Sequence, residues 1–171
     1  HIVTYNIHKG FSPLKGRMAV HEVRDTLHAL GPDLVFLQEV QGLSHLHARR
    51  HANWPEQPQH EFLADSLWSD FAYGRNAVYD EGHHGNAILS RFPIVRWDNE
   101  DISQSRLERR GLLHCEIAVP GWPQPLHCIN VHLALFARWR HRQVALLRAR
   151  IERLVPPDAP LVIAGDFNDW T

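Results

Sequence analysis

Two short apolar segments with one amphipathic segment between them constrain most strongly what this chain can fold into. Residues Ile2–Ile7 and Leu34–Leu37 are short and rich in branched or aromatic side chains, which is typical of buried strands. Between them, apolar residues recur at helical spacing over Arg17–Leu30, and Gly31 and Pro32 end that pattern. A strand, a helix and a second strand with short connections form a βαβ unit, so we expect neighbouring strands in one sheet.

The rest of the chain alternates in the same way between strand-like and helix-like segments. We expect a short helix over Glu61–Trp68 and a long amphipathic helix over Arg138–Leu154. Residues Tyr79–Gly85 have the composition of a loop, and Ser44–Pro58 that of a surface insertion. At 171 residues the chain is most simply one domain spanning residues 1–171. Further strands are expected at Phe71–Tyr73, Asn86–Arg91, Leu112–Val119, Leu126–Leu133 and Leu161–Ala164.

Composition and charge exclude several classes of protein. The chain has no long uninterrupted apolar run, so we expect no membrane span and no stable membrane insertion, and no signal peptide is visible. The net charge of −1 leaves no electrostatic footprint for tight nucleic-acid binding. Arginines cluster over Arg106–Arg110 and Arg138–Arg142, and we interpret both clusters as solvated faces. No obligate protein partner is evident.

The two cysteines, Cys115 and Cys128, lie on predicted neighbouring strands, so a disulfide between them is possible. Two cysteines in a chain of this size do not form a disulfide scaffold, however. We interpret them as small buried hydrophobic residues in a reducing compartment, and we therefore expect a cytoplasmic location.

The segment that follows the last expected strand carries a dense group of oxygen ligands. The apolar run Leu161–Ala164 stops at Gly165, and Asp166, Asn168 and Asp169 follow at once. Carboxylate and carboxamide oxygens suit Mg²⁺, Mn²⁺ or Ca²⁺ rather than a soft metal. The alternative is a plain turn, because Gly, Asp and Asn form turns at any strand end.

Other expected strands also deliver polar residues at or near their carboxyl ends. Glu39 comes after an apolar strand, where a charge is rarely tolerated without a partner. Period-two alternation places Cys128, Asn130 and His132 on one face of their strand. His132 is either a satisfied structural histidine or a group that stabilises or protonates a phosphate. If the strands share a sheet edge, these residues converge with Asn6 and with the last strand end.

Two further polar stretches are weaker signals. His84 and Asn86 lead into a strand, and a plain loop is the alternative interpretation. His45, His47 and His51 have spacings that zinc ligands use, but no cysteine partner or HExxH pattern accompanies them.

Five motifs together resemble a known family. They occur in the order found in the endonuclease/exonuclease/phosphatase superfamily, and they cover essentially the whole chain. Each motif is weak evidence alone, whereas five motifs in the family's order are specific. Their sequences are most similar to those of small bacterial members whose substrates are unassigned. The motifs are Tyr5–His8, Leu37–Glu39, Gly85–Arg91, Asn130–Leu133 and Gly165–Asn168.

The resemblance implies a fold and an activity. The fold is a four-layer α/β/β/α sandwich, in which two packed mixed sheets are flanked by helices. The activity is hydrolysis of a phosphoester with Mg²⁺ or Mn²⁺ as cofactor. In the family pattern Glu39 is the principal metal ligand, and Asn6 lies beside the metal or the phosphate.

The resemblance also assigns roles to residues further along the chain. His132 contacts the phosphate and takes part in proton transfer, while Asp166 orients or deprotonates the attacking water. Asn168 holds the phosphate or the metal. His84 and Asn86 are expected on the phosphate-binding side. Attack would be in line at phosphorus, with the metal offsetting charge on the phosphoryl oxygens.

Two alternatives stay open for the function. The expected activity is that of a phosphodiesterase whose substrate is a nucleic acid, a phospholipid headgroup or a soluble phosphodiester. Hydrolysis of a phosphomonoester is the open alternative for the substrate. The alternative is a non-catalytic module on the same fold that binds a phosphate group or a protein.

The chain departs from the family pattern at two places. Abasic-site endonucleases carry an aspartate where this chain has His8, so a second carboxylate ligand from the first strand is in doubt. The family also completes its site with a later aspartate and a Ser-Asp-His motif, which does not occur before Thr171. We therefore expect residues 1–171 to be a fragment that is truncated at its C-terminus, with poor or no catalysis by themselves.

Overall fold

The computed structural model describes residues 1–12, 17–44, 53–79 and 82–169. The elements in chain order are β1 (Ile2–Asn6), the 3₁₀ turn η1 (His8–Gly10), α1 (Val20–Leu30), β2 (Leu34–Ser44), α3 (Gln59–Ala64), β3 (Asp70–Tyr79), β4 (Gly82–Ser90), β5 (Ile94–Asp101), β6 (Gly111–Ile117), β7 (Leu126–His132), α4 (Ala137–Leu154) and β8 (Leu161–Asp166). Within this part of the chain, every helix is too short or too polar to cross a bilayer.

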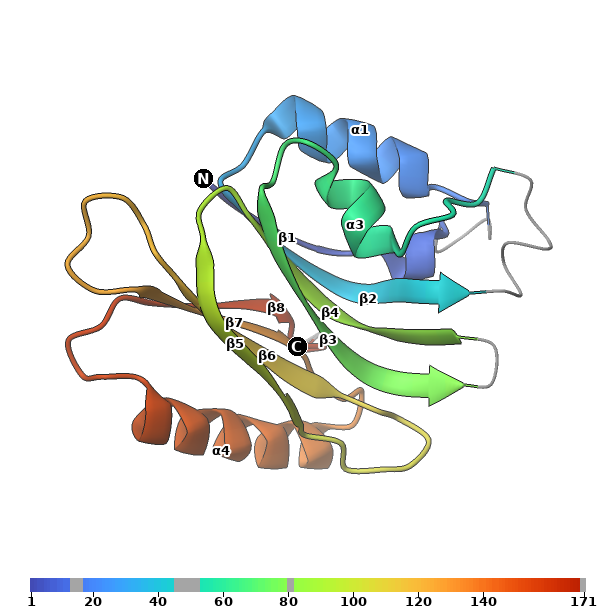
Figure 1. The fold of residues 1–171 in the computed structure, drawn as a ribbon. Coiled ribbons are helices and arrows are strands. Elements are labelled where there is room, and N and C mark those ends of the chain that lie inside the picture. The colour runs from blue at the N-terminus through green and yellow to red at the C-terminus, as the bar shows by residue number, and fades with distance from the viewer. Residues whose placement is uncertain (13–16, 45–52, 80–81, 170–171) are drawn as a thin grey trace.

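Two four-stranded sheets pack face to face between helices (Figure 1). The first sheet has the order β1-β2-β4-β3 and the second has the order β5-β6-β7-β8. Strands β1 and β2 are parallel, as are β7 and β8, and the remaining pairs are antiparallel. Helices α1 and α3 cover the first sheet and α4 covers the second, which confirms the predicted four-layer α/β/β/α sandwich of mixed sheets. The predicted βαβ unit is β1-α1-β2.

Apolar side chains fill each of the three spaces between the layers. The strand pattern explains this, because alternate residues of a strand point to opposite faces of its sheet. Residues Cys128 and Phe36 pack between the two sheets, whereas Ile129 and Val131 face Leu147 of α4. The alternation predicted for β7 is therefore confirmed. Cys115 and Cys128 lie opposite each other in the β6–β7 ladder as free, buried thiols, so the predicted small hydrophobic residues are confirmed.

Two predicted boundaries differ from the structure, and strand pairing accounts for both differences. Residues Tyr79–Gly85 were predicted as a loop, but β3 extends to Tyr79 and β4 begins at Gly82. Strand β2 continues to Ser44 instead of ending at Leu37. In both places polar residues form strands because backbone groups pair across the ladder, whatever the side chains.

Strand β5 was not predicted, because its sequence is rich in charged residues. Its polarity has a structural reason, since Asp98 and Glu100 bind the buried guanidinium of Arg150 on α4 at 2.8 and 2.6 Å. The weak zinc prediction falls on His45, His47 and His51, which lie outside the described residues.

Asn130 of β7 connects the two sheets through polar contacts inside the core. It is fully buried, and its Nδ2 donates hydrogen bonds to the carbonyl oxygens of Leu37 (2.9 Å) and Ala87 (2.8 Å) in the first sheet. Its Oδ1 accepts a hydrogen bond from Gln38 Nε2 at 2.8 Å. One side chain thus satisfies three groups of the opposite sheet that water cannot reach.

We expect Asn130→Ala to lower the free energy of unfolding by roughly 2 to 4 kcal/mol, because it leaves buried polar groups without partners. Urea denaturation measures this loss. Asn99→Ala is the matched control, since the amide of Asn99 is partly exposed and donates only at 3.3 and 3.4 Å. If both variants lowered the free energy of unfolding by the same amount, the hydrogen bonds of Asn130 between the sheets would not be a main stabilising contact.

His60 of α3 is a buried titratable group in the core of the first sheet. Its ring stacks on Tyr73 with centroids 4.4 Å apart, and its Nδ1 has no hydrogen-bond partner. Burial, with a smaller contribution from His83, lowers the pKa of His60 to about 4. The neutral ring therefore belongs to the folded state, whereas an unfolded chain binds a proton near pH 6.5.

Stability should consequently fall in acid. The contribution of neutral His60 to the free energy of unfolding is complete above about pH 6.5 and is lost as the pH falls toward 4. The loss amounts to roughly 1 to 2 kcal/mol by pH 5. His60→Phe removes the titrating group and keeps the stacked ring, so its unfolding free energy should fall less between pH 7 and pH 5. Urea titrations at both pH values test this, with the exposed His141→Phe as control. An equal loss in wild type and His60→Phe would contradict it.

Candidate active site

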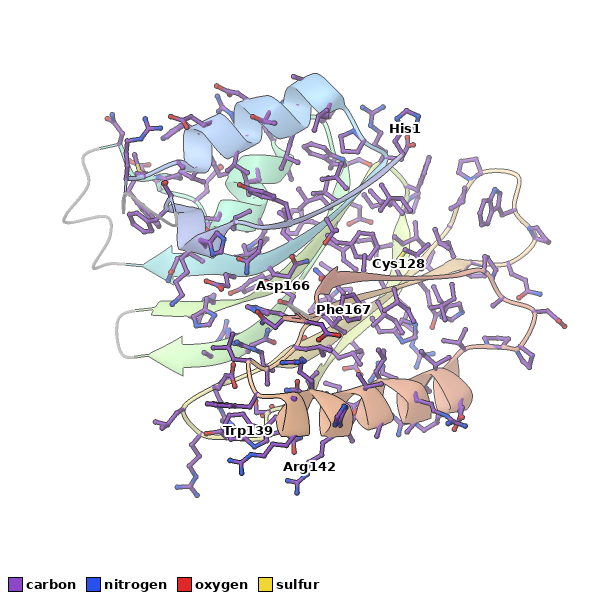
Figure 2. All side chains as sticks on the ribbon, turned by 180° about the vertical axis from the view of Figure 1, so that it is seen from behind. His1, Cys128, Trp139, Arg142, Asp166 and Phe167 are labelled. Atoms are coloured by element: carbon purple, nitrogen blue, oxygen red, sulfur yellow. The ribbon has the colours of Figure 1, made fainter. Side chains whose placement is uncertain are left out.

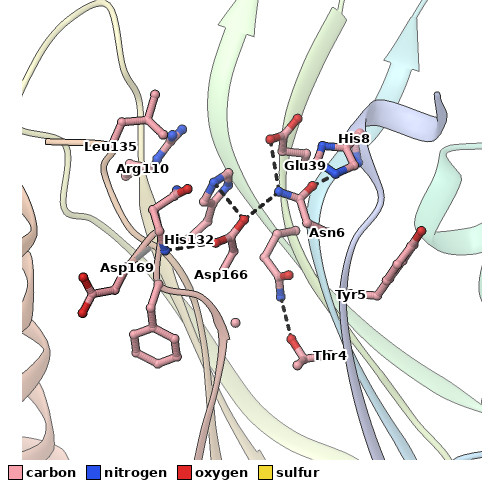
Figure 3. A pocket seen from close by; sticks show the side chains of 14 residues that line it. Thr4, Tyr5, Asn6, His8, Glu39, Arg110, His132, Leu135, Asp166 and Asp169 are labelled. Carbon is pink, nitrogen blue, oxygen red and sulfur yellow. Dashed lines mark hydrogen bonds and ion pairs between the residues drawn. The ribbon is translucent and has the colours of Figure 1, made fainter. Parts of the chain in front are cut away.

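A cavity of about 650 Å³ opens where the carboxyl ends of β1 and β8 approach each other from the two sheets (Figure 3). Strands β1, β7 and β8 direct their carboxyl ends toward it, whereas β2 contributes Gln38 and Glu39 from its middle. Its wall includes side chains from sequence positions more than 150 residues apart. The lining residues are Thr4, Tyr5, Asn6, His8, Gln38, Glu39, Arg110, His132, Leu135, Gly165, Asp166, Phe167, Asn168 and Asp169.

Glu39 reaches this cavity from a bulge inside β2. The register jumps between Leu37 and Val40, and Glu39 has a φ of 52° in the left-handed region. That conformation is costly for a residue with a Cβ, and such strain is typical of functional positions. The bulge turns the Glu39 carboxylate toward the cavity. A regular strand would point this side chain in another direction.

Asn6 of β1 links the two carboxylates of the site. Its Nδ2 donates to Glu39 Oε1 at 3.2 Å and to Asp166 Oδ2 at 3.0 Å. Its Oδ1 accepts the backbone N–H of His8 at 3.0 Å, so the orientation of the amide is determined. Asn6 therefore presents its nitrogen, and not its oxygen, to the carboxylates. This orientation gives no support to Asn6 as a direct metal ligand.

Asp166 stands at the carboxyl end of β8, directly after a glycine that the packing requires. A Cβ on Gly165 would collide with the carbonyl oxygen of Val131, and φ at Gly165 is +146°. Burial by itself would raise the pKa of Asp166. Hydrogen bonds from Asn6 Nδ2 and from the backbone N–H of Asn168 outweigh burial, and the net shift of the pKa is downward. Asp166 is thus an anion at neutral pH.

His132 ends β7 beside this anion. Its Nε2 lies 3.7 Å from Asp166 Oδ2, and the ring is buried. Burial lowers the pKa of His132 to about 4, and Arg110 acts in the same direction, whereas Asp166 and Glu39 oppose the shift. The ring is therefore neutral near pH 7, with one nitrogen able to donate and the other able to accept a proton.

Arg110 is a cavity residue that sequence reasoning missed. Its Nε donates to the carbonyl oxygen of Leu133 at 3.2 Å, and its Nη2 pairs with Glu108 at 2.8 Å. The guanidinium therefore forms a fixed positive charge beside His132. In the sequence Arg110 is one member of an arginine cluster, and no local pattern distinguishes it from exposed Arg109.

The remaining predicted residues occupy different places. Asn168 lies in the cavity wall, where its Nδ2 donates to the carbonyl oxygen of Leu133 at 2.8 Å. His84 lies opposite Gln41 in the β2–β4 ladder, and burial followed by Lys9 lowers its pKa to about 4.

Asn86 is not brought to the cavity. It is fully buried, and its Nδ2 donates to the carbonyl oxygens of Gly111 (3.0 Å) and Asn130 (3.4 Å). Contact with a phosphate would require these strands to separate. The position of Asn86 therefore supports a role in joining strands and gives no support to phosphate binding.

With this fold and cavity, the chain belongs to the endonuclease/exonuclease/phosphatase family, whose model it matches over residues 3–171. Members of this family are hydrolases that act on phosphoester bonds. The resemblance predicted from the five motifs is confirmed.

Individual relatives agree with this membership. YbhP, an uncharacterized protein of Escherichia coli (strain K12), is 47% identical over 169 residues, which make up 99% of this chain and 66% of the relative. The chain thus spans just under two thirds of that relative's length. An endonuclease/exonuclease/phosphatase from Beutenbergia cavernae is 26% identical with a TM-score of 0.76, covering 99% of this chain and 47% of the other. A humanized TDP2 of D. rerio is 20% identical with a TM-score of 0.71 over 99% of this chain and 63% of the other, which is a likeness of fold alone.

The oxygen donors at the cavity fit a hard cation with few protein ligands. Glu39 and Asp166 lie within hydrogen-bond distance of the same amide, so both carboxylates can approach one ion. Among the described residues, no group of three or more His, Cys, Asp or Glu side chains is placed to hold a metal. Mg²⁺ accepts such a site because it keeps several waters, whereas a zinc site needs three or four protein ligands.

We expect Glu39→Gly to be more stable than Glu39→Ala by about 0.5 to 1 kcal/mol, because glycine adopts the left-handed conformation without strain. Both variants lose the carboxylate, so the difference between them isolates the backbone. Urea denaturation in EDTA measures it. Equal stability, or a more stable alanine variant, would show that the bulge stores no strain at this residue.

Proposed function

We propose that this protein is a Mg²⁺- or Mn²⁺-dependent phosphoester hydrolase, with a phosphodiester as its most suitable substrate. The observation that carries the proposal is the meeting of Glu39 and Asp166 from opposite sheets at the amide of Asn6, with His132 beside them. A fold without turnover has little need to hold two carboxylates together in a partly buried cavity.

In the proposed site Glu39 and Asp166 would hold the cation, which supplies charge neutralisation at the phosphoryl oxygens. Asn6 would hold both carboxylates in position through its Nδ2. This assignment replaces direct ligation by Asn6, for the reason that its oxygen is engaged by the His8 backbone.

The remaining residues would handle the phosphate and the proton. Arg110 is positioned to offset negative charge on a phosphoryl group in the cavity. Neutral His132 would donate a hydrogen bond to a phosphoryl oxygen, and Asp166 would orient the attacking water and take its proton. Asn168 would hold the loop after β8 against Leu133. His84 lies near enough to the site to modulate its charge.

A cytoplasmic location is part of the proposal. Its support is the pair Cys115 and Cys128, which face each other across the ladder as free thiols. Buried thiols of this kind persist in reducing compartments.

Hydrolysis of a generic phosphodiester and a generic phosphomonoester by the full-length protein, with Mg²⁺, Mn²⁺ or EDTA, tests the proposal. We expect activity that EDTA removes and that Glu39→Gln lowers at least about 100-fold, because the cation loses a charged ligand. Glu61→Gln is the matched control, since Glu61 lies on α3 away from the cavity and should leave the activity unchanged.

Two outcomes would contradict the proposal in different ways. Activity that neither EDTA nor Glu39→Gln affects would reject the mechanism. Metal binding, seen as a Mg²⁺-dependent rise in melting temperature, without hydrolysis of either ester would favour the non-catalytic binding module.

A further inference from the structure

The two arginine clusters, which are 28 or more positions apart along the chain, meet at one end of the second sheet. Residues 102–110 form the yellow loop that passes the start of α4 in Figure 1. The loop is tied there by two contacts: the Leu135 N–H donates to Glu108 Oε1 at 3.1 Å, and Arg110 Nε donates to the Leu133 carbonyl at 3.2 Å. The clusters around Arg106 and Arg138 therefore form one continuous region.

Large apolar side chains protrude from the same region. We name Leu107, Leu135, Phe136 and Trp139 the apolar rim. Leu107 is 99% exposed, Leu135 62% and Phe136 59%. The ring of Trp139 packs edge-on against Phe136 with centroids 4.9 Å apart, and Figure 2 shows Trp139 near the start of α4. Neighbouring exposed side chains of this size mark an interaction surface more often than a solvated one.

The backbone under the apolar rim is held firmly in place. Arg140 Nη1 donates to the Leu135 carbonyl at 2.7 Å. The buried Gln143 accepts the Ala134 N–H at 2.8 Å and donates to the Ile102 carbonyl at 3.1 Å. Leu135 thus projects from a fixed frame, so binding through it would need little ordering of the chain.

Positive charge surrounds the apolar rim. Arg106, Arg138 and Arg142 are exposed, and in the described part of the chain none of the three forms an ion pair. The carboxylates nearby are already engaged, in the pairs Glu108–Arg110, Asp101–Arg109 and Asp169–Arg140. The region is therefore locally basic on a chain whose net charge is −1.

We propose that this face docks on the surface of an anionic phospholipid bilayer. Leu107, Leu135 and Phe136 would enter the boundary between headgroups and acyl chains, while the unpaired arginines bind lipid phosphates. Single-stranded nucleic acid is the competing partner, and it requires open aromatic faces on which bases stack. Of the two aromatic rings in the rim, Trp139 is only partly exposed and packs edge-on against Phe136, whereas Leu107 is 99% exposed. The apolar rim therefore favours the lipid surface.

The position of the surface also suggests a substrate class, and this step rests on the proposed function. Leu135 belongs to the apolar rim and to the wall of the cavity, where it lies close to Arg110 (Figure 3). A bilayer docked on the rim would bring lipid headgroups to the mouth of the cavity. The scissile phosphoester would then be that of a phospholipid headgroup.

Co-sedimentation of the full-length protein with vesicles tests the surface without requiring turnover. Vesicles of phosphatidylcholine alone are compared with vesicles that also contain phosphatidylglycerol. We expect binding to the anionic vesicles that weakens with added salt, because exposed charge attraction is screened. Glu39→Gln should bind as wild type does, so failure of the hydrolase proposal and failure of the docking surface give different results.

Paired variants identify the contributing residues. Arg138→Gln with Arg142→Gln should weaken partitioning about 30-fold, since each arginine contributes about fivefold near an anionic surface. Leu107→Ser with Leu135→Ser should weaken it about 10-fold or more by removing buried apolar area. The controls are Leu30→Ser on α1 and Arg96→Gln on β5, which are exposed residues away from the rim.

Each outcome decides the proposal. Loss of binding in both paired variants, with the controls unchanged and all melting temperatures near wild type, supports it. No binding to anionic vesicles, or binding that the paired variants retain, overturns it. Binding of a single-stranded oligothymidine that the arginine variants lose, without vesicle binding, would overturn it in favour of nucleic acid.

Discussion

The structure depends on the polar contacts that Asn130 makes between its two sheets. Asn130 of β7 reaches across a largely apolar interface and satisfies Leu37, Ala87 and Gln38 of the first sheet. Because these partners are buried, any sliding of one sheet over the other would leave carbonyl groups without hydrogen bonds. These contacts thereby determine how β2 and β7 face each other, and the candidate active site lies two residues further along both strands, at Glu39 and His132.

The site is built from two similar units that face each other. Each unit is a βαβ arrangement, β1-α1-β2 and β7-α4-β8. Strands β1, β7 and β8 direct their carboxyl ends toward the cavity, and β2 reaches it through its internal bulge at Glu39. The backbone departs from regular strand geometry where the chemistry requires it, at the left-handed Glu39 and at Gly165. The carboxylates that converge there would repel each other, and the Nδ2 of Asn6 between them reduces this repulsion.

Much of the fold could be predicted because the spacing of apolar residues along the sequence indicates which faces of helices and strands are buried. The parallel pair β1–β2, the alternation along β7 and the two long helices all follow from the spacing of apolar residues. Strand β5 escaped prediction because its charged residues pair with Arg150, a partner 50 positions away that no local pattern reveals. For the site, sequence motifs named Asn6, Glu39, His132 and Asp166, which the structure brings to one cavity. They also named Asn86, which the structure buries between strands, and they missed Arg110.

The sequence by itself determined the layered α/β class, the family and the residues whose side chains can take part in chemistry. These depend on residue type and local spacing. Tertiary structure decided which of those residues meet. The orientation of the Asn6 amide depends on the His8 backbone, and the direction of the Glu39 carboxylate depends on a bulge against β4. The two arginine clusters meet because the loop before β6 contacts the backbone of Leu133 and Leu135. Such contacts form between segments far apart in the chain, and local sequence carries no information about their distances.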